Sequence, residues 1–389
     1  MPTILGPAFL AIGDGSSTYA RLAVERGRIA AILPTEGPSD HSFPEGSSIA
    51  PGLIDLHTNG AQDALFNRDQ GNAIPVASRS YAAMGATGFV ASVMTAPWES
   101  MLHAASEIVE AAHEIEEGEP IGARCLGVHF EGPFLAPKYR RVHRGECLLP
   151  ASAARAQEMI DACRGALVMV TLAPEVPGAS EFVRRMLEHG VLCSAGHTGA
   201  RYAEGLLAIG TGYRSLTHAF NGMPALDHRE PSLLAAFMQD RRTVVQVICD
   251  GHHVAPPMID LLYRMLGDRV VLATDYMPPA GPGYRVEGGV MRADDGTIAG
   301  SALTIDRALL NYMAYTGLPF AQAIVAATNA PARAIGKQDE IGRIAVGMRA
   351  DLSFWDARHE VIATMVGGEF VYQRAPVLIS QETSAALTP

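Results

Sequence analysis

The most informative residues are ionisable side chains at or just beyond the ends of short apolar runs. There are six of them: His57, Glu131, His197, His218, Asp250 and Asp275. Imidazole and carboxylate groups are favoured ligands of zinc, and a cation held by three of them keeps one position open for water. Taken alone, such a histidine more often makes a structural hydrogen bond, and such an aspartate often caps a helix. The repeated pattern favours a metal-dependent hydrolase, with a barrel enzyme that uses no metal and a non-catalytic relative as alternatives.

The apolar runs predict the scaffold that positions these side chains. Eight runs alternate with helical patterns: Leu53–Leu56, Thr87–Met94, Leu126–Phe130, Leu167–Leu172, Val191–Ala195, Tyr213–Thr217, Val244–Cys249 and Val270–Thr274. Such runs are typical of parallel strands buried on both faces, and Glu99–Glu117 between two of them has one apolar helical stripe. The order predicts an α/β fold of the (β/α)8 TIM-barrel type. In this fold the carboxyl ends of all strands meet at one mouth, where active sites are built.

The two ends of the chain differ from this middle part. Ala20–Val24 and Arg28–Ile32 are predicted to form a hairpin, and short strands are also expected at Asp351–Trp355, Val361–Val366 and Glu369–Tyr372. Neither end alone can build a good core. We therefore predict a composite β-sandwich domain from residues 1–50 and 343–389, and a catalytic barrel from residues 51–342.

Composition excludes several classes of protein. The chain has 389 residues and a net charge of −11, and no basic stretch could follow a nucleic-acid backbone. Its five cysteines are odd in number and lack CxxC spacing, which argues against a disulfide framework and a thiolate zinc site. No apolar run approaches the ~18 residues of a membrane span, and no signal peptide is evident at the start. We expect a cytoplasmic protein with no nucleic-acid or membrane partner.

An ordered set of motifs carries a resemblance to a known family. Ala50–Asn59 resembles the first-strand signature of the amidohydrolase superfamily. Six further segments narrow the resemblance: Leu126–Phe134, Thr171–Glu175, Ser194–Thr198, Thr217–Pro224, Asp250–Val254 and Gly300–Thr304. Together, from about Gly27 to about Gly368, the chain resembles the N-acetylglucosamine-6-phosphate deacetylase family.

The resemblance implies that Glu131, His197 and His218 bind one divalent metal ion per subunit. Zinc is the expected metal, and iron, manganese and cobalt are alternatives. Such a metal lowers the pKa of bound water toward ~7, which helps hydrolysis of a neutral amide. The family commonly has His-x-His or Gln-x-Asn after the first strand, where this chain has His57 and Asn59. We therefore expect a single metal, with a weaker second site near these two residues as the alternative.

The resemblance also implies roles around the metal. Asp275 would take a proton from water and deliver it to the leaving nitrogen, while His253 would bind substrate and polarise the acetyl carbonyl. Asp250 is expected to orient a neighbour. The remaining substrate-binding residues implied are His143, Asn221, Gly222 and Arg229. Arg229 would reach the sugar phosphate from a partner subunit, which predicts a homodimer; a surface ion pair is its alternative role.

These roles imply removal of the N-acetyl group from an N-acetylated amino-sugar 6-phosphate by metal-bound hydroxide. N-acetylglucosamine 6-phosphate is the expected substrate. The alternatives are N-acetylgalactosamine 6-phosphate, an unphosphorylated sugar, another amide, or a non-catalytic oligomeric scaffold of the same fold. Pro278–Asp295 is Gly/Pro-rich and shorter than in the family. Because it follows Asp275, it is expected to affect which sugar fits.

Overall fold

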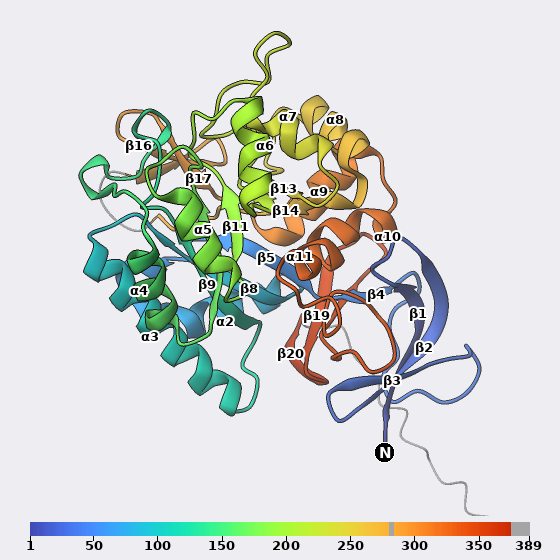
Figure 1. Cartoon of the computed structure of the whole chain (residues 1–389). Coiled ribbons are helices and arrows are strands. Elements are labelled where there is room, and N and C mark those ends of the chain that lie inside the picture. Colours follow the sequence, from blue (N-terminus) through green and yellow to red (C-terminus); the bar gives the residue numbers. More distant parts are fainter. Residues whose placement is uncertain (280–283, 375–389) are drawn as a thin grey trace, which may run out of the picture.

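The central feature of the computed structural model is an eight-stranded parallel sheet that curves into a barrel (Figure 1). The structure describes residues 1–279 and 284–374. The barrel strands, in chain order, are β5 (Leu53–Thr58), β8 (Ala86–Met94), β9 (Arg124–Glu131), β10 (Leu167–Leu172), β11 (Leu192–Ala195), β12 (Ser215–Leu216), β13 (Val244–Val247) and β14 (Val270–Leu272). Each contains or overlaps one of the eight apolar runs, so the predicted barrel is confirmed.

The barrel is closed by contacts between its first and last strands. Thr58, the last residue of β5, forms a parallel bridge with Tyr276, which lies beyond the end of β14. The backbone N–H of Asp275 donates to the carbonyl oxygen of His57 at 2.8 Å, and the Thr274 hydroxyl donates to Asp55 Oδ2 at 2.6 Å. These bonds hold residues 274–276, which follow β14, beside the carboxyl end of β5.

A helix follows each barrel strand and covers the outside of the sheet (Figure 1). In the described chain these helices are α2 (Ala73–Ala83), α3 (Trp98–Glu117), α4 (Ala153–Cys163), α5 (Ala179–Leu187), α6 (Tyr202–Thr211), α7 (Leu233–Gln239), α8 (Pro256–Leu266) and α9 (Ile305–Thr316). Shorter elements are β6 (Gly60–Ala61), β7 (Ala64–Leu65), α1 (Phe66–Asp69), α10 (Phe320–Ala323) and α11 (Asn329–Ala334). The predicted helix at Glu99–Glu117 is confirmed as α3, which buries Met101, Ala104, Ala105 and Ile108.

The two ends of the chain form a second sheet of seven strands. These are β1 (Thr3–Ala11), β2 (Ser17–Glu25), β3 (Arg28–Leu33), β4 (Ser48–Pro51), β18 (Leu352–Trp355), β19 (Val361–Val366) and β20 (Glu369–Gln373). β4 joins the halves, because it pairs with β1 on one side and with β18 on the other. The predicted hairpin of Ala20–Val24 with Arg28–Ile32 is confirmed by β2 and β3.

A small β domain built from both ends is thus confirmed, and its strands form one continuous sheet with its own apolar core. Figure 1 shows the blue and the red strands together beside the barrel. The boundaries at residues 50 and 343 stay predictions, and residues 375–389 lie outside the described part. No helix in the described ranges is long and apolar enough to cross a bilayer.

An antiparallel hairpin sheet follows β14 before the chain returns to the barrel. It comprises β15 (Tyr284–Glu287), β16 (Val290–Ala293) and β17 (Ile298–Ser301). Sequence patterns predicted only a Gly/Pro-rich stretch over Pro278–Asp295, of which residues 280–283 lie outside the described residues. Met291 and Ala299 pack with Met94 and Val142, so this sheet lies against segments beyond the ends of the barrel strands.

Candidate active site

Three side chains with metal-ligand chemistry meet at the carboxyl ends of barrel strands. Glu131 ends β9, while His197 and His218 each lie two residues beyond β11 and β12. Their Nε2 atoms lie 3.1 and 3.3 Å from Glu131 Oε1 and 3.1 Å from each other. Ligand atoms ~2.1 Å from a tetrahedral metal ion lie roughly 3.4 Å apart, so this spacing fits a metal ion.

The hydrogen bonding of His197 supports the same interpretation on chemical grounds. Its Nδ1 lies 2.9 Å from the carbonyl oxygen of Tyr139, which only accepts, so Nδ1 carries the proton. Nε2 of His197 is the nitrogen that faces Glu131 and His218, and burial lowers the pKa of His218. Two imidazole nitrogens and a carboxylate oxygen thus meet at one point, and this set of donor atoms fits a divalent metal.

Glu131 is ionised despite its burial. Burial alone would raise its pKa, but the surrounding histidines, His57 and His143 foremost, hold the pKa of Glu131 well below its usual range. Nε2 of His143 lies 3.6 Å from Glu131 Oε2. The centre therefore contains a buried negative charge that a bound cation would stabilise.

Asp275 and His57 form a second group beside the first. Nε2 of His57 lies 3.4 Å from both Glu131 Oε2 and Asp275 Oδ1. Asn59 donates from Nδ2 to the same Asp275 oxygen at 2.9 Å and so orients that carboxylate. Burial lowers the pKa of His57, but the charges of Glu131 and Asp275 outweigh this effect and raise it to about 9. These ligand atoms also lie close enough together to hold a cation.

The backbone bends sharply at three of these residues. The φ angle is +48° at His197, +31° at His218 and +47° at Asp275. Positive φ is uncommon for residues with a Cβ atom, and such conformations cluster at functional sites, where surrounding structure maintains them. All three side chains line the same cavity.

His253 reaches this cavity from the loop after β13. Its Nδ1 lies 2.6 Å from Asp250 Oδ2, and Asp250 Oδ1 accepts the backbone N–H groups of His252 and His253 at 2.8 Å each. The His253 bond, against the effect of burial, helps to lower the pKa of Asp250. An ionised Asp250 therefore holds the ring of His253 with its other nitrogen free to act, while His252 is exposed.

The cavity has a volume of about 210 Å³ and unites most of the predicted site residues. Those lining it are Glu131, His143, His197, His218, Asn221, Gly222, His253 and Asp275. His57 and Asn59 lie buried behind it. Arg229 lies outside it in an exposed segment, where its backbone N–H donates to Asp227. One chain thus assembles the predicted residues except Arg229.

Gly222 has a specific steric role. Its φ is +61°, and a Cβ atom there would lie 3.2 Å from Nδ1 of His197. The N–H of Thr198 donates to the Gly222 carbonyl oxygen at 3.0 Å, so the two strand-end loops are held together. A side chain at this position would disturb the ring that faces Glu131.

Several cavity residues were not predicted from sequence. They are Met94, Arg141, Val142 and Thr297–Gly300. Arg141 belongs to the basic run Lys138–Arg141, whose composition alone also suits a solvated loop. Thr297–Gly300 come from the unpredicted hairpin sheet, and only Gly300 belongs to one of the family-like motifs. These residues add one guanidinium group and several apolar side chains to the wall of the cavity.

Comparisons with known proteins agree with this geometry. Residues 48–371 match the amidohydrolase family. The chain is 31% identical to N-acetylglucosamine-6-phosphate deacetylase of Vibrio furnissii over 363 residues, covering 90% of each. It is 32% identical to N-acetylgalactosamine-6-phosphate deacetylase of Escherichia coli O157:H7 over 359 residues, covering 90% of this chain and 94% of that protein.

Solved structures extend the similarity to the fold. A mutant N-acetyl-D-glucosamine-6-phosphate deacetylase of Mycobacterium smegmatis, in complex with N-acetyl-D-glucosamine-6-phosphate, superposes with a TM-score of 0.87. It is 29% identical, and the match covers 96% of this chain and all of that one. The corresponding Thermotoga maritima enzyme has a TM-score of 0.83 at 27% identity, covering 96% of this chain and 100% of that one.

Proposed function

Since the chain belongs to the amidohydrolase family and to its N-acetylglucosamine-6-phosphate deacetylases, we propose that it removes the acetyl group from an N-acetylated amino-sugar 6-phosphate. The observation that carries the proposal is the convergence of Glu131, His197 and His218 in a cavity also lined by Asp275 and His253. This combination supplies a cation site, a proton carrier and an oxyanion partner, which are the groups that amide hydrolysis needs.

Glu131, His197 and His218 would hold one divalent ion, with zinc as the favoured metal because of its preference for imidazole and carboxylate. Such an ion supplies Lewis-acid activation of water and of the amide carbonyl when bound. His57 and Asp275, with Glu131, are the candidates for a weaker second cation.

Asp275 and His253 would carry the remaining steps. As the water oxygen bonds to the acetyl carbon, Asp275 accepts a water proton and then delivers it to the nitrogen, whose bond to carbon breaks. Asn59 keeps the Asp275 carboxylate in place through its 2.9 Å bond. His253, held by Asp250, would donate from its free nitrogen to the carbonyl oxygen as negative charge develops there. The products are acetate and the amino-sugar 6-phosphate.

The sugar phosphate would be bound by the loop after β12, with Asn221 and Gly222 from one subunit and Arg229 from a partner. Arg229 does not line the active-site cavity of its own subunit, which supports a contact with the phosphate in the partner's cavity. His143 would contact the sugar. Because Arg229 would act in the partner's site, we propose a homodimer. The cytoplasmic location stays a prediction.

A kinetic panel tests the proposed reaction. Acetate release is measured for N-acetylglucosamine 6-phosphate, N-acetylgalactosamine 6-phosphate and both unphosphorylated sugars, with bound metal quantified in the same preparation. We expect turnover of at least one phosphorylated epimer and a large loss of kcat/KM without the phosphate. Relatives of both specificities are equally similar to this chain, so the panel also identifies the epimer.

Two results would redirect the proposal. Equal kcat/KM with and without phosphate, unaffected by Arg229→Ala, would favour an unphosphorylated sugar or another amide. Absence of both acetate release and bound divalent metal in carefully purified protein would favour a non-catalytic scaffold.

A further inference from the structure

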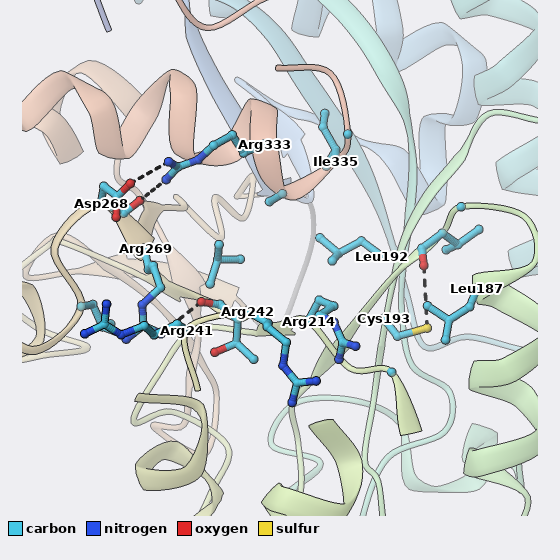
Figure 2. A pocket seen from close by; sticks show the side chains of 18 of the residues that line it. Leu187, Leu192, Cys193, Arg214, Arg241, Arg242, Asp268, Arg269, Arg333 and Ile335 are labelled. Carbon is cyan, nitrogen blue, oxygen red and sulfur yellow. Dashed lines mark hydrogen bonds and ion pairs between the residues drawn. The ribbon is translucent and has the colours of Figure 1, made fainter. Parts of the chain in front are cut away.

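A second, larger cavity lies at the opposite end of the barrel from the candidate active site. Its volume is about 840 Å³, and its wall includes Leu192 and Val244, which begin β11 and β13, and residues that immediately precede β12 and β14. Figure 2 shows this cavity with its lining side chains. It shares no lining residue with the 210 Å³ cavity at the carboxyl ends of the strands.

The lining of this second cavity is strongly basic in an otherwise acidic protein. Five arginines contribute to it: Arg214, Arg241, Arg242, Arg269 and Arg333. In the described chain their only ion-pair partners are Asp268, which pairs with Arg333 at 2.6 Å, and Asp240, which pairs with Arg242 at 2.6 Å. Within residues 1–279 and 284–374, the other three arginines form no ion pair. The local charge is therefore +3 (five arginines minus two aspartates), against −11 for the whole chain.

Several of these guanidinium groups are fixed in place before any ligand arrives. Nη1 of Arg214 donates to the carbonyl oxygens of Ile209 and Tyr213, both at 2.8 Å. Arg269 donates to four carbonyl oxygens of the segment from Phe237 to Thr243, at 2.7–3.2 Å. Carbonyl oxygens hold these two side chains in place without forming an ion pair with them. Such pre-ordering lowers the entropy cost of binding an anion.

The arginines of this cavity lie close enough together to act on one another's charge. Burial lowers the pKa of Arg269; among its charged neighbours, Asp268 and Asp240 raise this pKa and Arg241 lowers it. Arg241 itself has no hydrogen-bond or ion-pair partner among the described residues. A bound anion would relieve the repulsion between these neighbours.

The opposite wall of the cavity is apolar. Figure 2 places Leu187, Leu192 and Ile335 on one side and the arginines mainly on the other. Inorganic phosphate would contact only the basic side. A volume of about 840 Å³ suits a larger organic molecule, since small-molecule sites usually measure roughly 300–1,000 Å³.

From this geometry we infer a binding site for a multiply charged organic phosphate at the amino-terminal end of the barrel. Its phosphates contact Arg241, Arg242 and Arg214, because planar guanidinium groups match phosphate oxygens in forked pairs. Its organic part lies on the Leu187, Leu192 and Ile335 wall. The site is separate from the substrate cavity and does not depend on the proposed deacetylation.

Calorimetric titration of the full-length protein tests the inference. The probes are ATP, fructose 1,6-bisphosphate and inorganic phosphate, and metal content is measured before and after each titration. We expect saturable binding of at least one organic probe, weakened by salt and stronger than that of inorganic phosphate. The two organic probes separate a nucleotide from a sugar phosphate as the source of this chemistry.

Substitutions locate the binding. Arg241→Ala/Arg242→Ala removes two exposed charges and should weaken binding at least about tenfold. Arg79→Ala/Arg358→Ala removes the same charge from exposed positions outside the cavity and should bind as wild type. Arg229→Ala, at the proposed substrate phosphate contact, should also bind the organic probe as wild type. Acetate release should be unchanged in the first two variants.

Four results would overturn the inference; the first three concern the wild-type protein and the Arg241/Arg242 variant. They are no saturable binding of either organic probe, equal affinity of the Arg241/Arg242 variant and wild type, or inorganic phosphate binding as tightly as the organic probes. Loss of probe binding in Arg229→Ala alone would assign the binding to the substrate cavity and would also overturn it. Because acetate release is measured separately, failure here is distinguishable from failure of the proposed deacetylation.

Discussion

At the scale of single residues, Asp275 is the group whose replacement discriminates best between mechanisms. Asp275→Asn keeps the shape and the oxygen that accepts from Asn59 but removes the proton acceptor. We expect kcat to fall by roughly 10²–10⁴-fold, the usual contribution of a positioned acid–base group, with little change in melting temperature. Acetate release and thermal unfolding measure both.

The matched control for this change is Asp294→Asn. Asp294 lies in the turn between β16 and β17, and its side chain is 82% exposed. The same chemical change there should leave turnover and stability at wild-type values. Wild-type turnover in Asp275→Asn would exclude that residue as the proton carrier.

Removal of the metal should inactivate and destabilise the protein. Glu131, His197 and His218 bring electron-rich atoms within 3.1–3.3 Å of one another, so stripping the ion leaves a buried carboxylate without its cation. Dialysis against a chelator should abolish acetate release and lower the melting temperature, and added zinc should restore both. Unchanged activity in protein proved metal-free by elemental analysis would contradict the proposed chemistry.

At the scale of elements, burial explains what the sequence patterns could predict. Strands such as β8 and β10 are enclosed on both faces, so each leaves a continuous apolar run. The hairpin sheet leaves no such run, because Tyr284–Glu287 are all exposed. Its contribution to the cavity depends on packing between Met291 and the distant Met94 and Val142, which no local pattern encodes.

Within the candidate site, too, local sequence patterns reveal some features and long-range contacts determine others. Residue type and position at the strand ends mark six candidates, and the family resemblance selects Glu131, His197 and His218 among them as ligands. The contacts that orient the site, such as Asn59 with Asp275 and Tyr139 with His197, join residues 216 and 58 positions apart. These contacts follow from barrel closure and loop path, so sequence reasoning alone missed them.

Arg269 is expected to stabilise the carboxyl end of a helix. It caps the carboxyl end of α7 and the turn beyond it through four carbonyl oxygens. Arg269→Met leaves these acceptors without their charged donor, and we expect the free energy of unfolding to fall by about 2–4 kcal/mol. Arg264→Met, which breaks an exposed ion pair with Asp260 on α8, should cost at most about 0.5 kcal/mol. Equal stability of the two variants in denaturant titrations would contradict the capping role.

At the scale of the whole molecule, Asp351 connects the seven-stranded sheet to the barrel. Its carboxylate accepts from Arg124 of β9 at 2.9 Å, from Arg349 at 3.1 Å and from the N–H of Gly367 at 2.7 Å. Asp351→Asn would leave Arg349 without its counter-charge and Arg124 with only the exposed Glu116, 3.6 Å away. We expect a loss of about 3 kcal/mol in unfolding free energy, with kcat unchanged because the active site lies at the other end of β9.

Glu188→Gln is the control for the loss of one surface ion-pair partner. Glu188 pairs with Arg185, and its side chain is 60% exposed, so little stability should be lost. A fall in kcat for Asp351→Asn at a temperature where the protein stays folded would indicate that the sheet also shapes the active site.

The five thiols report on the integrity of the barrel as a whole. All are free, and burial raises the pKa of Cys125 to about 11 and of Cys163 and Cys193 to about 12 each. Only the thiolate reacts, so an aromatic disulfide reagent should label the native protein slowly. The partly exposed Cys125 should react first, and in denaturant all five thiols should react. Cys193 lies on β11, which leads to His197, so metal removal should speed its labelling through local opening. Mass spectrometry of labelled peptides distinguishes the sites, and equal Cys193 rates with and without metal would show that the centre does not stabilise this strand.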